Sequence, residues 1–396
     1  MDKESEALDY RRRYRGLIGV RSKMPIRDVS VLSRIYTPGV GAVCKEIARN
    51  PASSYRYTCR GNSIALISDG SQVYEFGNIG AAAVLPKLEA KSVIYKTFAN
   101  VDAVPIALKT QDPYEIIEIV RVLAPSFGGF CLESIAAPKC FTIENRIRHA
   151  VRVSVLHHEN HASGIIVLAA LYNALKLVGK RLEDVRVVIN GAGVAGALRV
   201  YRTVGMDWAK SEIARLVGPQ DVKGDLAEVI KGADVFIGLS AGGLVTREMV
   251  ASMAKDPIVF ALALPEPEIS EAEAKASGAA VVATGQADSD NQIRSSLVTP
   301  GFFRGCLDVG AYKVNIEMYL AAARALADMI PEDKLTTKNI IPRQMDWHIS
   351  PVIAEAVARA AQETGVAQMT REVVTPERIH ERTESYIYEG ELAWLP

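Results

Sequence analysis

The chain has 396 residues, of which 49% are hydrophobic and 23% are charged, with 46 basic and 46 acidic side chains. A formal net charge of zero gives no field that would gather nucleic acid or an anionic membrane surface, so we expect neither as a partner. The length exceeds what a single hydrophobic core usually serves, and we expect at least two domains.

The cysteine content indicates a reducing compartment. The five cysteines are scattered, odd in number and never in C-x-x-C spacing, which favours free thiols over disulfides or a structural zinc site. We expect no secretory signal at the N-terminus and no apolar stretch long enough to span a bilayer. Together these features predict a cytoplasmic protein.

The first part of the chain, residues 1–160, alternates short apolar strands with helical segments. The predicted strands include NSIALISDG at 62–70 and VDAVPIALKT at 101–110. From about Ser163, GIIVLAALYNALKLVGK has the long apolar face of a packed helix. This pattern predicts a first α/β domain that ends near residue 160.

The second part, residues 161–330, carries short buried strands separated by helices. These strands are VRVVINGAG, ADVFIGLSA, PIVFALAL and AAVVATG. Such alternation is typical of a doubly wound, Rossmann-like α/β sheet. Residues 331–396 read as a C-terminal helical extension that packs on the body or on a partner subunit.

The segment VVINGAGVAG, residues 187–196, is a strand followed by a glycine-rich turn and a helix. In this context G-x-G-x-x-G predicts a dinucleotide site, because the glycines allow a tight turn and a close approach of the backbone to a pyrophosphate. Glycines can also be kept for strand–helix packing alone. The predicted cofactor-binding residues are Gly191, Gly193, Val194, Ala195 and Gly196.

The chain after this turn is unusually short. A dinucleotide fold has a second strand that ends in an acidic residue about 20 positions on, which holds the adenine ribose. Here no apolar strand closes on an acid, although Asp207 or Glu212 offers a carboxylate. The pattern therefore predicts a shortened sheet that lacks one strand. It leaves two alternatives open, weak binding of NAD or loss of the redox half-reaction.

Nine blocks spread over nearly the whole chain resemble, in order and approximate spacing, the malic enzyme family in its short bacterial form. They are RIYTPGV, SDGSQVYEFGNIG, LEAKSVIYK, PSFGGFCLES, HHENHASG, INGAGVAG, GADVFIGLSA, VVATG and TPGFFRGCLDV. The resemblance implies oxidation of malate with NAD or NADP, decarboxylation of the bound oxaloacetate and protonation of the enolate. It also implies Mg²⁺ or Mn²⁺ at the substrate and a homodimer. Function still depends on the site itself.

The same resemblance assigns two catalytic roles. Tyr36 matches the tyrosine that protonates the enolpyruvate carbon, and Lys91 matches the lysine that acts as general base on the substrate hydroxyl. Such a lysine needs desolvation or nearby cations to lower its pKa. Asn78 and Arg304 also match substrate-binding positions, and an arginine there is suited to a bidentate contact with a carboxylate.

The metal-binding positions of the family match only in part. Where the family has Glu-Asp, this chain has Glu133 followed by Ser134, and Glu159 replaces a further Asp. Loss of a carboxylate weakens attraction for Mg²⁺ or Mn²⁺. His158 replaces an adjacent Asp, so Glu133, Glu159 and His158 form a candidate set for a softer ion. The alternative is an empty site with ordinary polar histidines.

The substrate side also departs from the family. Leu264 and Ser295 stand where the family has substrate-binding Asn residues. A buried amide that bonds a carboxylate cannot become Leu without leaving a polar partner unpaired.

Three functions therefore compete. The first is oxidative decarboxylation of malate or a related 2-hydroxy acid. The second is a decarboxylase or enol–keto isomerase that acts on a 2-oxo acid without nicotinamide, using Tyr36 and Lys91. The third is an inactive regulatory homologue, against which the retention of both residues argues.

Overall fold

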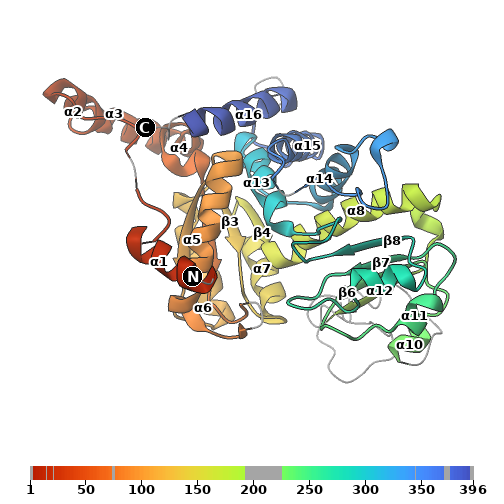
Figure 1. Cartoon of the computed structure of the whole chain (residues 1–396). Helices are drawn as coiled ribbons and strands as arrows, with labels where there is room; N and C mark the ends of the chain where they lie inside the picture. Colours follow the sequence, from red (N-terminus) through yellow and green to blue (C-terminus); the bar gives the residue numbers. More distant parts are fainter. Residues whose placement is uncertain are drawn as a thin grey trace.

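The computed structural model describes residues 3–14, 16–20, 22–73, 76–191, 225–343, 345–369 and 375–392. Two α/β parts lie next to each other, and a group of later helices covers them along one side (Figure 1). Both sheets are four-stranded, with all of their ladders parallel. The predicted fold class, with one α/β part followed by a doubly wound part, is confirmed.

The first sheet has the order β2-β1-β3-β4. Its strands are β1 (Ser63–Ser68), β2 (Asp102–Ala107), β3 (Gly129–Leu132) and β4 (Ser154–His157). Leu132 pairs with His157 at the carboxyl ends of β3 and β4, so the residues that follow these two strands emerge side by side. This edge of a parallel sheet is the usual location of functional residues in open α/β folds.

Three helices connect these strands, namely α5 (Gly80–Ala99), α6 (Pro113–Leu123) and α7 (Lys139–Ala150). The long helix α5 ends at Asn100, which adopts the left-handed conformation with φ of 48°. The Asp112 side chain accepts hydrogen bonds from the first backbone amides of α6 and begins that helix. Helix α5 packs on β2 and β1, with Val84, Leu88 and Lys91 on its buried face.

The second sheet has the order β5-β6-β7-β8 among the described residues. Its strands are β5 (Val187–Gly191), β6 (Val235–Leu239), β7 (Ile258–Ala261) and β8 (Val281–Thr284), with α10 (Leu226–Val229), α11 (Arg247–Ala251) and α12 (Glu271–Ala276) between them. All four predicted strands are therefore confirmed. The predicted loss of a strand after Gly196 falls on residues 192–224, which lie outside the described part of the chain.

A layer of helices joins the two parts through one hydrophobic core. It contains α8 (Ser163–Val178), α13 (Val298–Asp308), α14 (Ile316–Asp328) and α15 (Ile349–Glu363). Buried residues of these helices pack in one cluster with Leu66 of the first sheet and Phe260 of the second. The two sheets are thus held in a fixed relation by shared apolar burial.

Helix α8 bears on the expectation that no stretch could span a membrane. By length and composition alone, the 21 residues His158–Val178 are apolar enough to do so, a criterion that a buried core helix also meets. Half of the most apolar part of this segment is buried, and α8 packs against α14 within the core. These contacts are those of a core helix.

The N-terminal segment packs differently from the rest. It contains α1 (Lys3–Tyr14), α2 (Val29–Ile35), α3 (Gly39–Arg49) and α4 (Ser54–Tyr57). Every residue of α2 and α3 is described, and none is buried. These two helices extend from the upper left of the molecule (Figure 1). Helix α16 (Pro376–Leu392) packs on α15 and α5.

The structure also contains short helical turns, and two of them, η5 and η7, carry residues of the candidate site. They are η1 (Pro51–Ser53), η2 (Cys59–Asn62), η4 (Ala124–Ser126), η5 (His158–Ala162), η6 (Leu182–Asp184), η7 (Ser295–Leu297) and η8 (Glu332–Lys334). The turn η5 has π-helical geometry and runs directly from β4 into α8. Such single π turns are frequent at functional sites.

Candidate active site

Polar side chains from four elements converge at the carboxyl ends of β3 and β4. Glu133 follows β3, His158 begins the π turn after β4, Lys91 lies on α5, and Ser295 begins η7 after the second sheet. The turn η7 contacts both α5 and η5, and Lys91 of α5 bonds His158 of η5. The tertiary fold therefore brings together four residues predicted from sequence, although the first and the last lie 204 positions apart.

Lys91 is buried, and its amine is held by two partners. Its Nζ lies 2.7 Å from His158 Nε2 and 3.5 Å from Glu133 Oε1. The Ser295 hydroxyl lies 3.1 Å from the same His158 nitrogen. A desolvated amine with a fixed position is what a general base requires.

His158 is a neutral imidazole in this environment. Burial, together with the positive charge of Lys91 beside it, holds the pKa of His158 well below its ordinary value. A neutral ring presents one nitrogen as an acceptor, so it accepts a hydrogen bond where an imidazolium would repel the lysine. His158 therefore orients Lys91.

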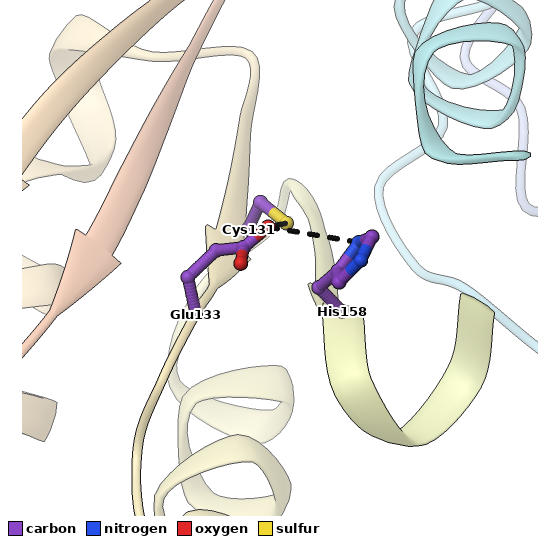
Figure 2. A group of neighbouring side chains, drawn as sticks. All are labelled: Cys131, Glu133 and His158. Atoms are coloured by element: carbon purple, nitrogen blue, oxygen red, sulfur yellow. Dashed lines mark hydrogen bonds and ion pairs between the residues drawn. The ribbon is translucent and has the colours of Figure 1, made fainter. Parts of the chain in front are cut away.

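Cys131, Glu133 and His158 place a ligand atom each within 4.8 Å of one another. Figure 2 shows the side chains of Cys131 and Glu133 pointing toward the imidazole from β3 and the residue after it. Burial, and then the nearby Glu133, raise the pKa of the Cys131 thiol well above its ordinary value. The Nζ of Lys91 lies 2.7 Å from His158 Nε2 and 3.5 Å from Glu133 Oε1, so it already occupies the space beside two of these three ligand atoms.

Lys87, which the sequence analysis missed, occupies the centre of the predicted metal site. Its Nζ lies 2.5 Å from Ser134 Oγ, 3.1 Å from Glu159 Oε1 and 3.7 Å from Glu133 Oε2. An ammonium thus stands among the three positions at which the family has its acidic metal ligands. The sequence did contain a signal, because Lys87 precedes Lys91 by four residues and so shares its helix face.

The two acids respond differently to this arrangement. Burial raises the pKa of Glu133, and the charges of Lys91 and Lys87 oppose that effect. For Glu159 burial also favours the neutral form, but Lys87 and His157 outweigh it and hold the pKa below its ordinary value. Glu159 is therefore ionised and forms an ion pair with Lys87.

Tyr36 and Arg304 were both predicted as site residues, but in the folded protein neither side chain lies beside Lys91. Tyr36 follows α2, is 65% exposed, and belongs to the segment that extends from the body. Arg304 is buried in α13, where its guanidinium forms a bidentate pair with Asp308 and also bonds Asn62. The donors of Arg304 therefore serve an internal network, which is a different setting from the predicted substrate contact.

The remaining predicted residues lie on loops. Asn78 is exposed just before α5 and exchanges two hydrogen bonds with the amide of Gln111. Leu264 follows β7 and is 53% exposed, so this position is not a buried one. Gly191 ends β5, whereas Gly193, Val194, Ala195 and Gly196 lie outside the described residues.

Comparison with known proteins gives the family. The model of the malic enzyme N-terminal domain matches residues 18–148, and that of the malic enzyme NAD-binding domain matches residues 209–362.

Two curated bacterial relatives and one solved structure agree with these matches. A bifunctional malic/malolactic enzyme of Bacillus subtilis is 43% identical and covers 99% of this chain and 100% of its own. An NAD-dependent malic enzyme of Geobacillus stearothermophilus is 44% identical over 89% of this chain and 78% of its own. A crystal structure of malic enzyme from Pyrococcus horikoshii has a TM-score of 0.88 at 34% identity, covering 99% and 97% of the two chains. The chain belongs to the malic enzyme family.

Proposed function

We propose that this protein oxidises and decarboxylates malate, or a related 2-hydroxy acid, with NAD⁺ or NADP⁺ as the hydride acceptor. The observation that carries the proposal is the buried Lys91 amine, fixed by His158 and Glu133 at the carboxyl edge of the first sheet. The names of the relatives support the same reaction.

The side chains around Lys91 suit the first half of this reaction. Lys91 accepts the proton of the C2 hydroxyl as the C2–H bond breaks, and the acceptor nitrogen of His158 keeps the amine in place. Ser295 reaches the same nitrogen from the second part of the chain and so ties the site to that part. When bound, the nicotinamide takes the hydride from C2.

The second sheet is suited to the dinucleotide. The family's NAD-binding domain is present, and Gly191 ends β5 at the carboxyl edge where dinucleotides bind parallel sheets. At this edge the Asn190 amide donates to the Ser240 hydroxyl, which joins the ends of β5 and β6. We therefore place the nucleotide along these strand ends and retain the redox half-reaction.

A divalent metal does not fit the residues that the structure describes. The ammonium of Lys87 lies among Glu133, Ser134 and Glu159. A divalent cation there would meet this positive charge and one carboxylate fewer than in the family. We assign no step to a metal.

We further propose a homodimer in which Tyr36 serves the Lys91 site of the other copy. The reaction needs an acid over the enolate carbon, yet Tyr36 is exposed on a segment that extends from its own body. The apolar residues Val29, Leu32, Ile35 and Val40 are exposed on the same segment. An unpartnered apolar surface of this kind is typical of a subunit interface.

All five cysteines are unpaired, which supports a reducing, cytoplasmic location.

The direct test is reduction of NAD⁺ or NADP⁺ with malate by the purified protein and by a Lys91→Met variant. We expect turnover by the unchanged protein and a loss of about 10³-fold in kcat for the variant, because the hydroxyl loses the amine that is positioned to accept its proton. Lys96→Met is the matched control, since Lys96 lies on the same helix but is half exposed and pairs with Asp102. Equal rates for both variants would refute the role of Lys91.

A further inference from the structure

We propose that the ammonium of Lys87 replaces the divalent metal ion in this protein and supplies the fixed positive charge beside the reacting atoms. The part of this inference that concerns catalysis rests on the proposed function. The part that concerns metal binding rests on the contacts of Lys87 alone.

The contacts of Lys87 coincide with the family's ligand positions. Glu133, Ser134 and Glu159 are the residues at which the resemblance places acidic ligands, and Lys87 Nζ contacts all three between 2.5 and 3.7 Å. The Lys87 side chain is only 12% exposed and Glu133 is fully buried. A buried ammonium among these oxygens occupies the space and neutralises the charge that a cation would use.

Ser134, which stands where the family has Asp, fits the proposed replacement of the metal ion by Lys87. A hydroxyl accepts a hydrogen bond from an ammonium without adding a negative charge, whereas an Asp would leave an excess of carboxylates around one lysine. The Ser134 amide also donates to Glu159 Oε1, which is the oxygen that Lys87 contacts. Ser134, Glu159 and Lys87 therefore form one hydrogen-bonded unit.

Lys87 and Lys91 are arranged for different tasks. They lie one helical turn apart and contact the two different oxygens of the Glu133 carboxylate. The nearest partner of Lys91 is the His158 imidazole at 2.7 Å, whereas Lys87 contacts the Ser134 hydroxyl at 2.5 Å and the Glu159 carboxylate at 3.1 Å. Lys87 is therefore the lysine whose ammonium is held at the family's ligand positions and supplies the fixed charge. A substrate oxygen that reaches Lys91 lies within a turn of this charge, which stabilises an oxyanion formed on decarboxylation.

The test exchanges the lysine for a metal site. In the double variant Lys87→Met with Ser134→Asp, the ammonium is gone and the family's Glu-Asp pair is restored. Ser134 has a φ of 57°, a left-handed conformation that Asp adopts more readily than most residues, so the backbone accommodates the change. The control is Lys96→Met with Ser134→Asp, which restores the carboxylate but keeps Lys87.

Binding of Mn²⁺ alone is measured by titration calorimetry and by the electron paramagnetic resonance signal of free Mn²⁺. We expect no saturable binding by the unchanged protein, and binding by the double variant at least about tenfold tighter than by the control. Thermal melts establish that each variant is folded. Saturable one-to-one Mn²⁺ binding by the unchanged protein would overturn the proposal. So would a folded double variant that binds no more tightly than the control.

Catalysis gives a second readout. Turnover by the unchanged protein should survive EDTA, whereas that of the double variant should require added Mn²⁺. Loss of wild-type turnover in EDTA that Mn²⁺ restores would also refute the inference. Because Mn²⁺ binding is measured without malate or nucleotide, a protein that fails to oxidise malate refutes the proposed function while the binding experiment still decides the role of Lys87.

Discussion

At the scale of single residues, the buried ionisable side chains have two different roles. Some form ion pairs in the candidate site, and others form hydrogen bonds with backbone amides of loops. Lys87, Lys91 and Glu133 share ion pairs at the ends of β3 and β4. Glu268, by contrast, is fully buried beside β6 and β7, where its two oxygens accept hydrogen bonds from the amides of Ser240 and Ala263. The Glu268 carboxylate thus fixes the two loops that follow β6 and β7 at the carboxyl edge of the second sheet.

Replacing Glu268 by Ala should therefore destabilise the protein. The change leaves two backbone amides without their acceptor, and we expect a loss of about 2–4 kcal/mol in the free energy of unfolding. Denaturant titration measures it, with Glu266→Ala as a control because Glu266 lies two residues away and is exposed. A loss in the control as large as that of Glu268→Ala would contradict this account.

The site could be predicted from sequence only where a residue's neighbours along the chain revealed its role. Lys91, Glu133, His158 and Ser295 stand in recognisable blocks, and the fold brings them together. The spacing of four residues from Lys91 indicated that Lys87 shares its helix face, but the role of Lys87 depends on residues 46 and 72 positions ahead that only the tertiary structure brings near. Arg304 shows the converse, since its motif suggested a substrate contact but Asp308, four residues on, pairs with it.

At the scale of elements, the packing of α13 against α15 determines how the helix layer closes over both sheets. Gly305 lies close against α15, and a Cβ there would lie 2.5 Å from the Ala354 carbonyl oxygen and 3.1 Å from Val357 Cβ. Gly164, at the start of α8, has nothing within 4 Å of its Cβ position. These two helical glycines therefore have different reasons for lacking a side chain.

Alanine substitutions at Gly305 and Gly164 should change the free energy of unfolding in opposite directions. Gly305→Ala should lower the free energy of unfolding by about 1–3 kcal/mol, because neither helix backbone can yield freely. Gly164→Ala should raise it by about 0.5–1 kcal/mol through the better helix propensity of Ala. Thermal and denaturant unfolding of both variants measure the difference, and effects of the same sign would contradict the packing described here.

The strands and helices could be predicted from the sequence for a physical reason. Apolar runs such as 62–70 and 257–264 form buried parallel strands, and the apolar segment after Ser163 forms a core helix. Such patterns report burial, which the local sequence encodes directly. The exposure of α2 and α3 could not be predicted from the sequence. An apolar helix face has the same sequence pattern whether it packs within one chain or between two chains. The division at residues 160 and 330 stays a prediction.

At the scale of the whole molecule, the proposed homodimer can be tested through the exposed α2–α3 segment, which carries Tyr36. If Tyr36 of one copy acts beside Lys91 of the other, two inactive variants should complement each other. A mixture of Tyr36→Phe and Lys91→Met, unfolded and refolded together, should regain about a quarter of the wild-type activity, because half of the dimers then hold one intact site.

Each variant refolded alone serves as the control, and light scattering confirms the mass of the dimer. A mixture as inactive as its components would show that Tyr36 and Lys91 act within one chain. A Tyr36→Phe variant that keeps full activity on its own would show that Tyr36 has no part in the reaction. An Ile35→Glu variant gives independent evidence, since a charge in the exposed apolar segment should shift the mass toward the monomer.

The most direct measurement of the central claim is the product stoichiometry with malate and NAD⁺ or NADP⁺. The account predicts one reduced nucleotide and one CO₂ for each pyruvate formed. Release of CO₂ with no reduced nucleotide, or from a 2-oxo acid alone while malate is untouched, would contradict it.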